Sequence, residues 1–171
     1  MLLNSFEKNK DLKLTYGPSL GQPELKEAIS ELYDHIDRSK IFITHGAIDA
    51  NFQVFYSLVE RGDTVVSIFP TYQQLYSVPE SFGANVKFWH LREENNWMPD
   101  LDELNELVDK NTKLIVINSP NNPTGALLDE KMLNGIAKIA EDAGAYVLND
   151  ESYRGLYIDP KDHVPSIVDI Y

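Results

Sequence analysis

Short apolar runs alternate with helical patterns along most of the chain, and this alternation constrains the fold more than any other feature. The helical patterns predict helices over residues 23–35, 47–60, 71–83, 101–109 and 129–143. The apolar runs predict strands over residues 41–44, 64–68, 85–90, 113–117 and 145–149. Apolar strands that are separated by helices are typical of a parallel sheet covered on both faces. The sequence therefore predicts an α/β fold with three layers, α/β/α, and a mostly parallel sheet.

The first 22 residues are polar and rich in turn formers, unlike the residues that follow. We expect an irregular lead-in over residues 1–22 and one compact unit over residues 23–171. The absence of cysteine excludes disulfides, thiolate catalysis and cysteine-bound metals, and we expect no metal site of another kind, because no acidic cluster has histidines at ligand spacing.

The net charge of −12 argues against nucleic acid or an anionic membrane as partner, since both require a basic surface. No apolar run approaches the roughly 20 residues that span a bilayer, and the first residues lack a secretory pattern. These features predict a cytoplasmic protein that acts on small molecules, with no nucleic-acid and no membrane partner.

In folds of this class, ligands bind beyond the carboxyl ends of the strands. After the strand predicted over residues 41–44 comes Gly46, and a helix is expected to begin at Ala47 and Ile48. Free amides at a helix start bind phosphate without any basic side chain. The alternative is a plain tight turn whose glycine contacts no ligand.

Two further strand ends carry unusual residues. Tyr72 follows the second predicted strand, where its ring either stacks on a flat ligand or packs in the core. The run Asn118–Gly125 follows the fourth and contains two prolines and a glycine, which predict a rigid turn. Asn122 lies within this run, and composition does not decide whether it donates to a ligand or only forms the turn.

Asp150 directly follows the last predicted strand. A carboxylate at the end of a buried strand requires a partner, because an unpaired buried charge costs several kcal/mol. A bound cation at the strand ends would supply that partner. The alternative is that Asp150 caps a following helix.

Taken in order, these segments resemble the large domain of the fold-type I pyridoxal-phosphate enzymes, most closely the class I/II aminotransferases. The run Asn118–Gly125 matches the family's Asn-Pro-Thr-Gly signature, and Asp150-Glu151-Ser152-Tyr153 follows at the expected distance. The resemblance extends over residues 14–157. Weaker matches in the right order include Tyr16 with Gly21, Gly46-Ala47, Arg61-Gly62-Asp63 and Pro70-Thr71-Tyr72.

The resemblance implies pyridoxal 5'-phosphate as cofactor and assigns roles to four side chains. It implies that Asp150 pairs with the protonated ring nitrogen, and that Asn122 and Tyr153 hydrogen-bond the phenolic oxygen. Tyr72 is implied to stack on the ring face. Asp150 and Tyr153 are thus the implied catalytic residues.

The resemblance also implies how the phosphate is held. The backbone amides of Gly46, Ala47 and Ile48 are implied to bind it. Tyr16 resembles the family's tyrosine that reaches the phosphate of the neighbouring subunit, which implies a homodimer. His45 departs from the family pattern, because a small residue is more usual before the glycine.

The function implied is transfer of an amino group between an amino acid and a 2-oxo acid. Residues 23–171 are then expected to be a partial large domain, with the small domain and the Schiff-base lysine segment outside this chain, so that the chain alone is inactive. Lys161 is expected to be a surface residue of a polar turn. The strand over residues 41–44 is expected to lack the neighbours that the family provides.

Other reactions remain open at this point, because many chemistries share these ring-holding residues. They include β-elimination, decarboxylation and ring formation by another fold-type I enzyme. A noncatalytic module that senses pyridoxal phosphate is the alternative from a different functional class.

Overall fold

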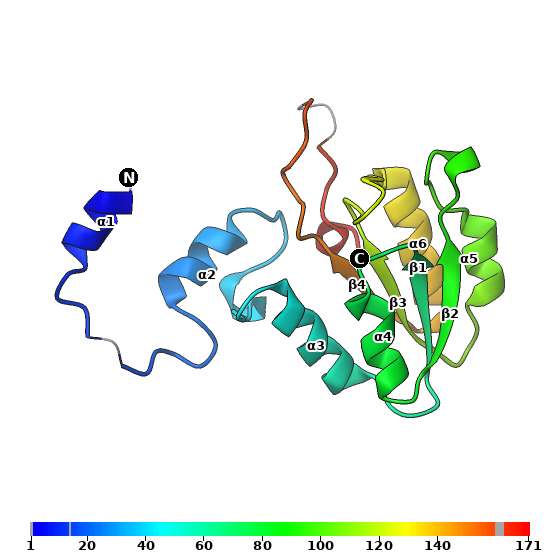
Figure 1. Cartoon of the computed structure of the whole chain (residues 1–171), viewed down its shortest axis with the longest axis horizontal. Helices are drawn as coiled ribbons and strands as arrows, with labels where there is room; N and C mark the ends of the chain where they lie inside the picture. Colours follow the sequence, from blue (N-terminus) through cyan, green and yellow to red (C-terminus); the bar gives the residue numbers. More distant parts are fainter. Residues whose placement is uncertain (1, 14, 160–162) are drawn as a thin grey trace.

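The strands form one parallel sheet in the order β2-β1-β3-β4, which confirms the predicted sheet (Figure 1). The strands are β1 (Thr64–Phe69), β2 (Asn85–His90), β3 (Thr112–Asn118) and β4 (Tyr146–Asp150). The computed structural model describes residues 2–13, 15–159 and 163–171, so the turn around Lys161 lies outside the described residues. Because β1, β3 and β4 are parallel, their carboxyl ends lie at one edge of the sheet.

Helices cover both faces of the sheet. The described residues form α1 (Leu2–Lys8), α2 (Pro23–Ser30), α3 (Ala47–Leu58), α4 (Gln74–Ser81), α5 (Leu101–Leu107) and α6 (Glu130–Ala143), with short 3-10 turns at Arg38–Lys40, Glu93–Asn95 and Ile167–Asp169, and the last four of these α-helices pack on the sheet (Figure 1). In Figure 1, α3 and α4 lie on one side of the sheet, and α5 and α6 on the other. This arrangement gives the three predicted layers.

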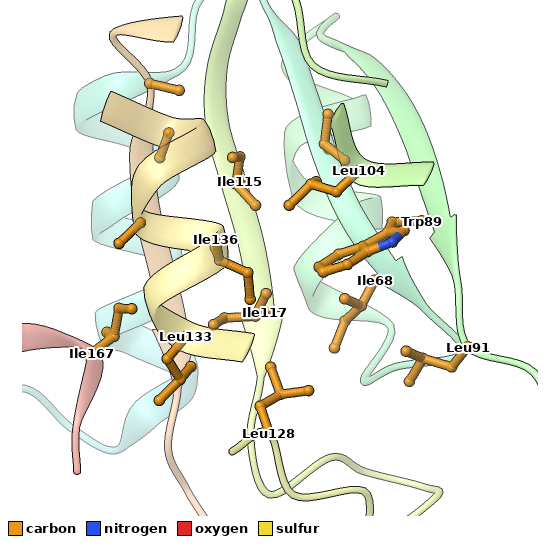
Figure 2. Close-up of a cluster of buried hydrophobic side chains, with 14 residues drawn as sticks. Ile68, Trp89, Leu91, Leu104, Ile115, Ile117, Leu128, Leu133, Ile136 and Ile167 are labelled. Carbon is orange, nitrogen blue, oxygen red and sulfur yellow. The ribbon is translucent and has the colours of Figure 1, made fainter. Parts of the chain in front are cut away.

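Two apolar cores result from the alternation of side chains along the strands. Val65 of β1 faces the core formed with α3 and α4, whereas Val66 faces the core formed with α5 and α6. Figure 2 shows the second core, in which Leu133 and Ile136 of α6 lie toward β3. The helices on this side begin at capped residues: for α6, the Asp129 carboxylate accepts from the backbone amide of Met132 at 2.7 Å.

The segment over residues 41–44 is not a strand, and this prediction is wrong. Its backbone makes isolated bonds only: the amide of Ile41 donates to Arg38 O at 3.3 Å, and that of Ile43 to Leu20 O at 3.4 Å. A strand requires a neighbour along its whole length. Within the described residues no strand pairs with this segment.

Other boundaries differ from the sequence predictions near the amino terminus and before α4. Within residues 1–22, expected to be irregular, Leu2–Lys8 form α1. The helix predicted over residues 23–35 ends at Ser30, and the one predicted over 71–83 begins only at Gln74. Both α1 and α2 lie apart from the sheet in Figure 1, so no packing against the core extends them.

Gly21 allows the lead-in to pass directly against the segment over residues 41–44. Its φ is +98°, and a Cβ at this position would lie 2.2 Å from Cγ1 of Ile43. Both the conformation and the contact require glycine. This contact fixes the approach of the chain to α3.

Candidate functional site

A pocket of about 300 Å³ lies at the carboxyl edge of the sheet. Residues from the start of α3 and from the loops after β1, β3 and β4 line it: Ala47, Ile48, Tyr72, Asn118, Asn122, Asp150, Ser152 and Tyr153. Six of these eight are residues that the sequence predicts for the site. The parallel sheet brings them together although they lie far apart in the chain.

Two predicted residues do not line this pocket. Gly46 lies immediately before α3 as its N-cap. Tyr16 lies in the lead-in, and its side chain is fully exposed. The geometry within one chain therefore does not bring Tyr16 to the pocket.

The carboxylate of Asp150 is buried, and its hydrogen-bond donors among the described residues are all neutral. Its Oδ1 accepts from the backbone amide of Ser152 at 3.0 Å and from the hydroxyl of Ser152 at 2.6 Å. Its Oδ2 accepts from Nδ2 of Asn51 at 2.8 Å. Within residues 2–13, 15–159 and 163–171, no Lys, Arg or His forms an ion pair with it. A cationic ligand in the pocket would complete its environment.

The alternative that Asp150 caps a helix is wrong. The residues that follow it form a turn, and its Oδ1 closes that turn through Ser152. The adjacent Glu151 instead pairs with Arg154 at 3.6 Å and accepts from the hydroxyl of Ser166 at 2.7 Å. The two neighbouring acids therefore have different environments, one at the pocket and one in the scaffold.

The start of α3 offers backbone amides to the pocket. Gly46 has a φ of 89° and a ψ of 165°, and no side chain caps the helix. A Cβ at Gly46 would meet nothing within 4 Å, and the next two residues, Ala47 and Ile48, line the pocket. Hydrogen bonds from Gln53 and from the backbone of His45 lower the pKa of Asp49, which remains ionised in this first turn. An anion at this helix start would be favoured by the helix dipole.

The turn after β3 is held by other asparagines than Asn122. The backbone amide of Asn122 donates to Oδ1 of Asn118 at 2.7 Å, and Oδ1 of Asn121 accepts from the hydroxyl of Thr124 at 2.9 Å. The peptide bonds before Pro120 and Pro123 are cis. Among the described hydrogen bonds, none uses the side chain of Asn122, so its side-chain amide is available to a ligand.

Both tyrosines of the pocket are partly exposed. Tyr72 is 40% exposed and Tyr153 is 42% exposed. Tyr72 belongs to neither apolar core, so the alternative of a core aromatic is wrong. Its ring is available to a flat ligand.

Sequence reasoning missed three polar residues that shape the site. Asn51 and Asn118 are buried, and Ser152 lines the pocket. A signal for Asn51 was present, because it lies one helical turn before Phe55 on the buried face of α3. A polar residue on the buried face of a helix requires a hydrogen-bond partner.

This donor set fits a flat, cationic heteroaromatic ring with an anionic tail, as pyridoxal phosphate is. Residues 5–170 match the sequence model of the family described as "Aminotransferase class I and II". The chain belongs to the class I and II aminotransferase family. The family consists of pyridoxal-phosphate-dependent enzymes.

Individual relatives agree with this assignment. An aspartate aminotransferase of Pyrococcus horikoshii is 42% identical over 160 residues, which cover 89% of this chain and 40% of the relative. Capreomycidine synthase of Streptomyces vinaceus is 34% identical over 149 residues, covering 87% and 38%. The chain thus spans about two fifths of the length of the curated relatives it matches.

A solved structure confirms the fold of this member of the family. The crystal structure of a PLP-dependent aminotransferase from Streptococcus suis superposes with a TM-score of 0.92 at 44% identity. The match covers 100% of this chain and 45% of the other. The three-layer arrangement is therefore that of a pyridoxal-phosphate transferase large domain.

The described part of the chain has neither a membrane-spanning helix nor a cluster of metal ligands. No helix there is both long and apolar enough to cross a membrane. No group of three or more His, Cys, Asp or Glu side chains there could hold a metal ion.

Proposed function

We propose that this chain is the cofactor-binding part of an aminotransferase that exchanges an amino group between an amino acid and a 2-oxo acid. The observation that carries the proposal is the carboxylate of Asp150, buried at a pocket with neutral donors only. A protonated ring nitrogen is the cationic group that such a carboxylate accommodates.

Each residue of the pocket has a role toward pyridoxal phosphate. The carboxylate of Asp150 holds a proton on the ring nitrogen, and Asn122 and Tyr153 hydrogen-bond the phenolic oxygen. Tyr72 covers the ring face. When bound, the cofactor supplies an electron-poor ring that stabilises negative charge on the substrate carbon.

The backbone amides of Gly46, Ala47 and Ile48 bind the phosphate. The open space at Gly46 and the uncapped start of α3 support this role. This arrangement needs no basic side chain, in keeping with the net charge of −12.

The organisation of the whole protein is part of the proposal. Residues 23–171 form part of the large domain, and the small domain and the Schiff-base lysine segment belong to the rest of the protein. The coverage of only about 40% of the Pyrococcus relative supports this division. The protein is a cytoplasmic homodimer in which the exposed Tyr16 contacts the phosphate of the neighbouring subunit.

A second candidate function is a reaction other than amino-group exchange on the same cofactor. The similarity to a protein named as a synthase, capreomycidine synthase, at 34% identity over 149 residues favours this candidate. It requires the same roles of Asp150, Asn122 and Tyr153.

The test uses the protein at its natural length, reconstituted with pyridoxal phosphate. We expect it to convert aspartate and 2-oxoglutarate to the partner 2-oxo acid and glutamate, measured by chromatography of both products. Cofactor binding without amino-group exchange for any of a panel of amino acids would favour the second candidate or a sensor module. Absence of cofactor binding would overturn the proposal.

A further inference from the structure

We infer that Asn51 is a positioning residue for Asp150, fixing the carboxylate for a ring that carries an N–H group. The inference rests on the proposed function. It concerns a residue of α3, whereas Asp150 ends β4, so the two meet only in the folded protein.

The contact is buried and direct. Asn51 is 4% exposed, and its Nδ2 lies 2.8 Å from Oδ2 of Asp150. Burial removes competing water, so this bond to a charged group is stronger than it would be at the surface.

Asn51 is itself held in place by Gln74. Its Nδ2 also approaches Oε1 of Gln74 at 3.3 Å, and Nε2 of Gln74 donates to the backbone oxygen of Ile48 at 2.6 Å. Ile48 is in the first turn of α3, where the phosphate is proposed to bind. One chain of hydrogen bonds therefore connects the phosphate end of the pocket with Asp150.

The number of hydrogen-bond donors around Asp150 explains how its carboxylate stays selective for a ring that carries an N–H group. Its two oxygens offer about four acceptor positions. Ser152 occupies both positions of Oδ1, and Asn51 occupies one of Oδ2. One position of Oδ2 remains for a ligand in the pocket that Asp150 lines.

The chemistry of the donor also matters. An amide is neutral and does not ionise, so Asn51 orients the carboxylate without neutralising it. A lysine or arginine at this position would pair with Asp150 and compete with a cationic ring. The asparagine leaves the negative charge for the ligand.

The test compares two ligands on the apoprotein at its natural length. One is pyridoxal phosphate, and the other is 1-deazapyridoxal phosphate, in which a C–H group replaces the ring nitrogen. We expect Asn51→Leu to weaken binding of pyridoxal phosphate about tenfold, as for one hydrogen bond to a charged group, and to leave the affinity for the deaza analogue unchanged. Titration calorimetry measures both dissociation constants.

The matched control is Gln53→Leu on the same helix. Gln53 donates to Asp49 at 3.1 Å and does not line the pocket, so this variant should bind both ligands as the parent does. Equal weakening of both ligands by Asn51→Leu would show a structural role and overturn the inference. Unchanged binding of both ligands would overturn it as well.

A second variant keeps the test decisive if Asn51→Leu does not fold. Gln74→Met removes the link to Asn51 and preserves side-chain length. We expect a selective loss of two- to threefold, roughly, for pyridoxal phosphate alone, because Asn51 keeps its direct bond. No selective loss in this variant would count against the inference. If the parent protein binds neither ligand, the proposed function itself is wrong. If the parent binds pyridoxal phosphate but the variants show no selective loss, only the inference about Asn51 is wrong.

Discussion

The side-chain amide of Asn118 donates a hydrogen bond of 2.8 Å to the backbone oxygen of Asp150. The two residues end β3 and β4 and are opposite each other in the register of the sheet. Through its Oδ1, Asn118 also accepts from the backbone of Asn122. One buried side chain thus holds two strand ends and the following turn, so the pocket is formed before any ligand arrives.

Replacing Asn118 by alanine should lower the free energy of unfolding by about 2–3 kcal/mol, because one buried and one partly buried hydrogen bond are lost. Urea denaturation measures the change. The exposed Asn134 on α6 also bonds a backbone oxygen, at 2.8 Å, and serves as the control. Asn134→Ala should change stability by less than about 0.5 kcal/mol. Equal effects of both substitutions would contradict the role assigned to Asn118.

Replacing Gly46 by alanine should reduce both stability and cofactor binding. Gly46 and Gly62 have φ values of +89° and +93°, and a Cβ at either position meets nothing within 4 Å. Both alanine variants should therefore lose about 1–3 kcal/mol of stability through backbone strain alone. Only Gly46→Ala should weaken binding of pyridoxal phosphate, measured by fluorescence titration. Comparable weakening in Gly62→Ala would remove the phosphate assignment.

Asp150→Ala should reduce turnover of the protein at its natural length by on the order of a thousandfold, because the ring nitrogen loses its partner. Glu151→Ala should leave turnover nearly unchanged but lower stability by about 1–2 kcal/mol, since the bonds to Ser166 and Asn149 are lost. Steady-state kinetics and thermal melts separate the two effects. An Asp150 variant as active as the parent would refute its role.

Acid should destabilise the contact between β2 and α5 through Glu103. Its pKa is lowered from the ordinary 4.5, first by the hydrogen bond from Arg92 and then by the backbone of His90. A carboxyl whose pKa is lower in the folded protein stabilises the fold above its ordinary pKa, and this contribution disappears as the pH falls through the folded value.

The corresponding measurement is urea denaturation at about pH 6 and about pH 3. Glu103→Gln should make the loss of stability between these conditions smaller than in the parent. The exposed Glu106 on the same helix forms no ion pair among the described residues, and Glu106→Gln is the control. An unchanged pH dependence in Glu103→Gln would argue against the contribution of this pair.

The sequence predicts those features of the fold that depend on the local pattern of apolar and polar residues. Val65 and Val66 belong to a continuous apolar run between helical patterns, and that run alone indicates a buried parallel strand. Asp150 could be recognised because an acid at the end of such a run is unusual. The run over residues 41–44 has the same local character, but a strand also requires a partner, which local pattern cannot supply.

The pocket was predictable only in part. Tyr72 and Asn122 were found through the position of strand ends and through family resemblance. Asn51 was not found, because its partner lies far along the chain and only the packing of α3 on the sheet brings them together. The exposure of Tyr72 excludes a place in the core, and that exposure depends on the packing of every neighbour, whereas its contact with a ligand stays a prediction.

The order of the strands also determines how this sheet assembles. Each pairing is parallel, so no two strands are joined by a hairpin. Strand β1 pairs with β3 although β2 lies between them in the sequence, so this pairing cannot form until the chain of β3 is in place. Such nonlocal pairings close long loops before they gain contacts, which slows folding. We expect the helices to appear early and the central β1–β3 pair late in refolding, which pulsed hydrogen exchange would detect as late protection of Val66 and Ile115. While the nascent chain emerges, the edge of β1 that later receives β3 stays open to other chains, and a chaperone that shields it would act during this interval.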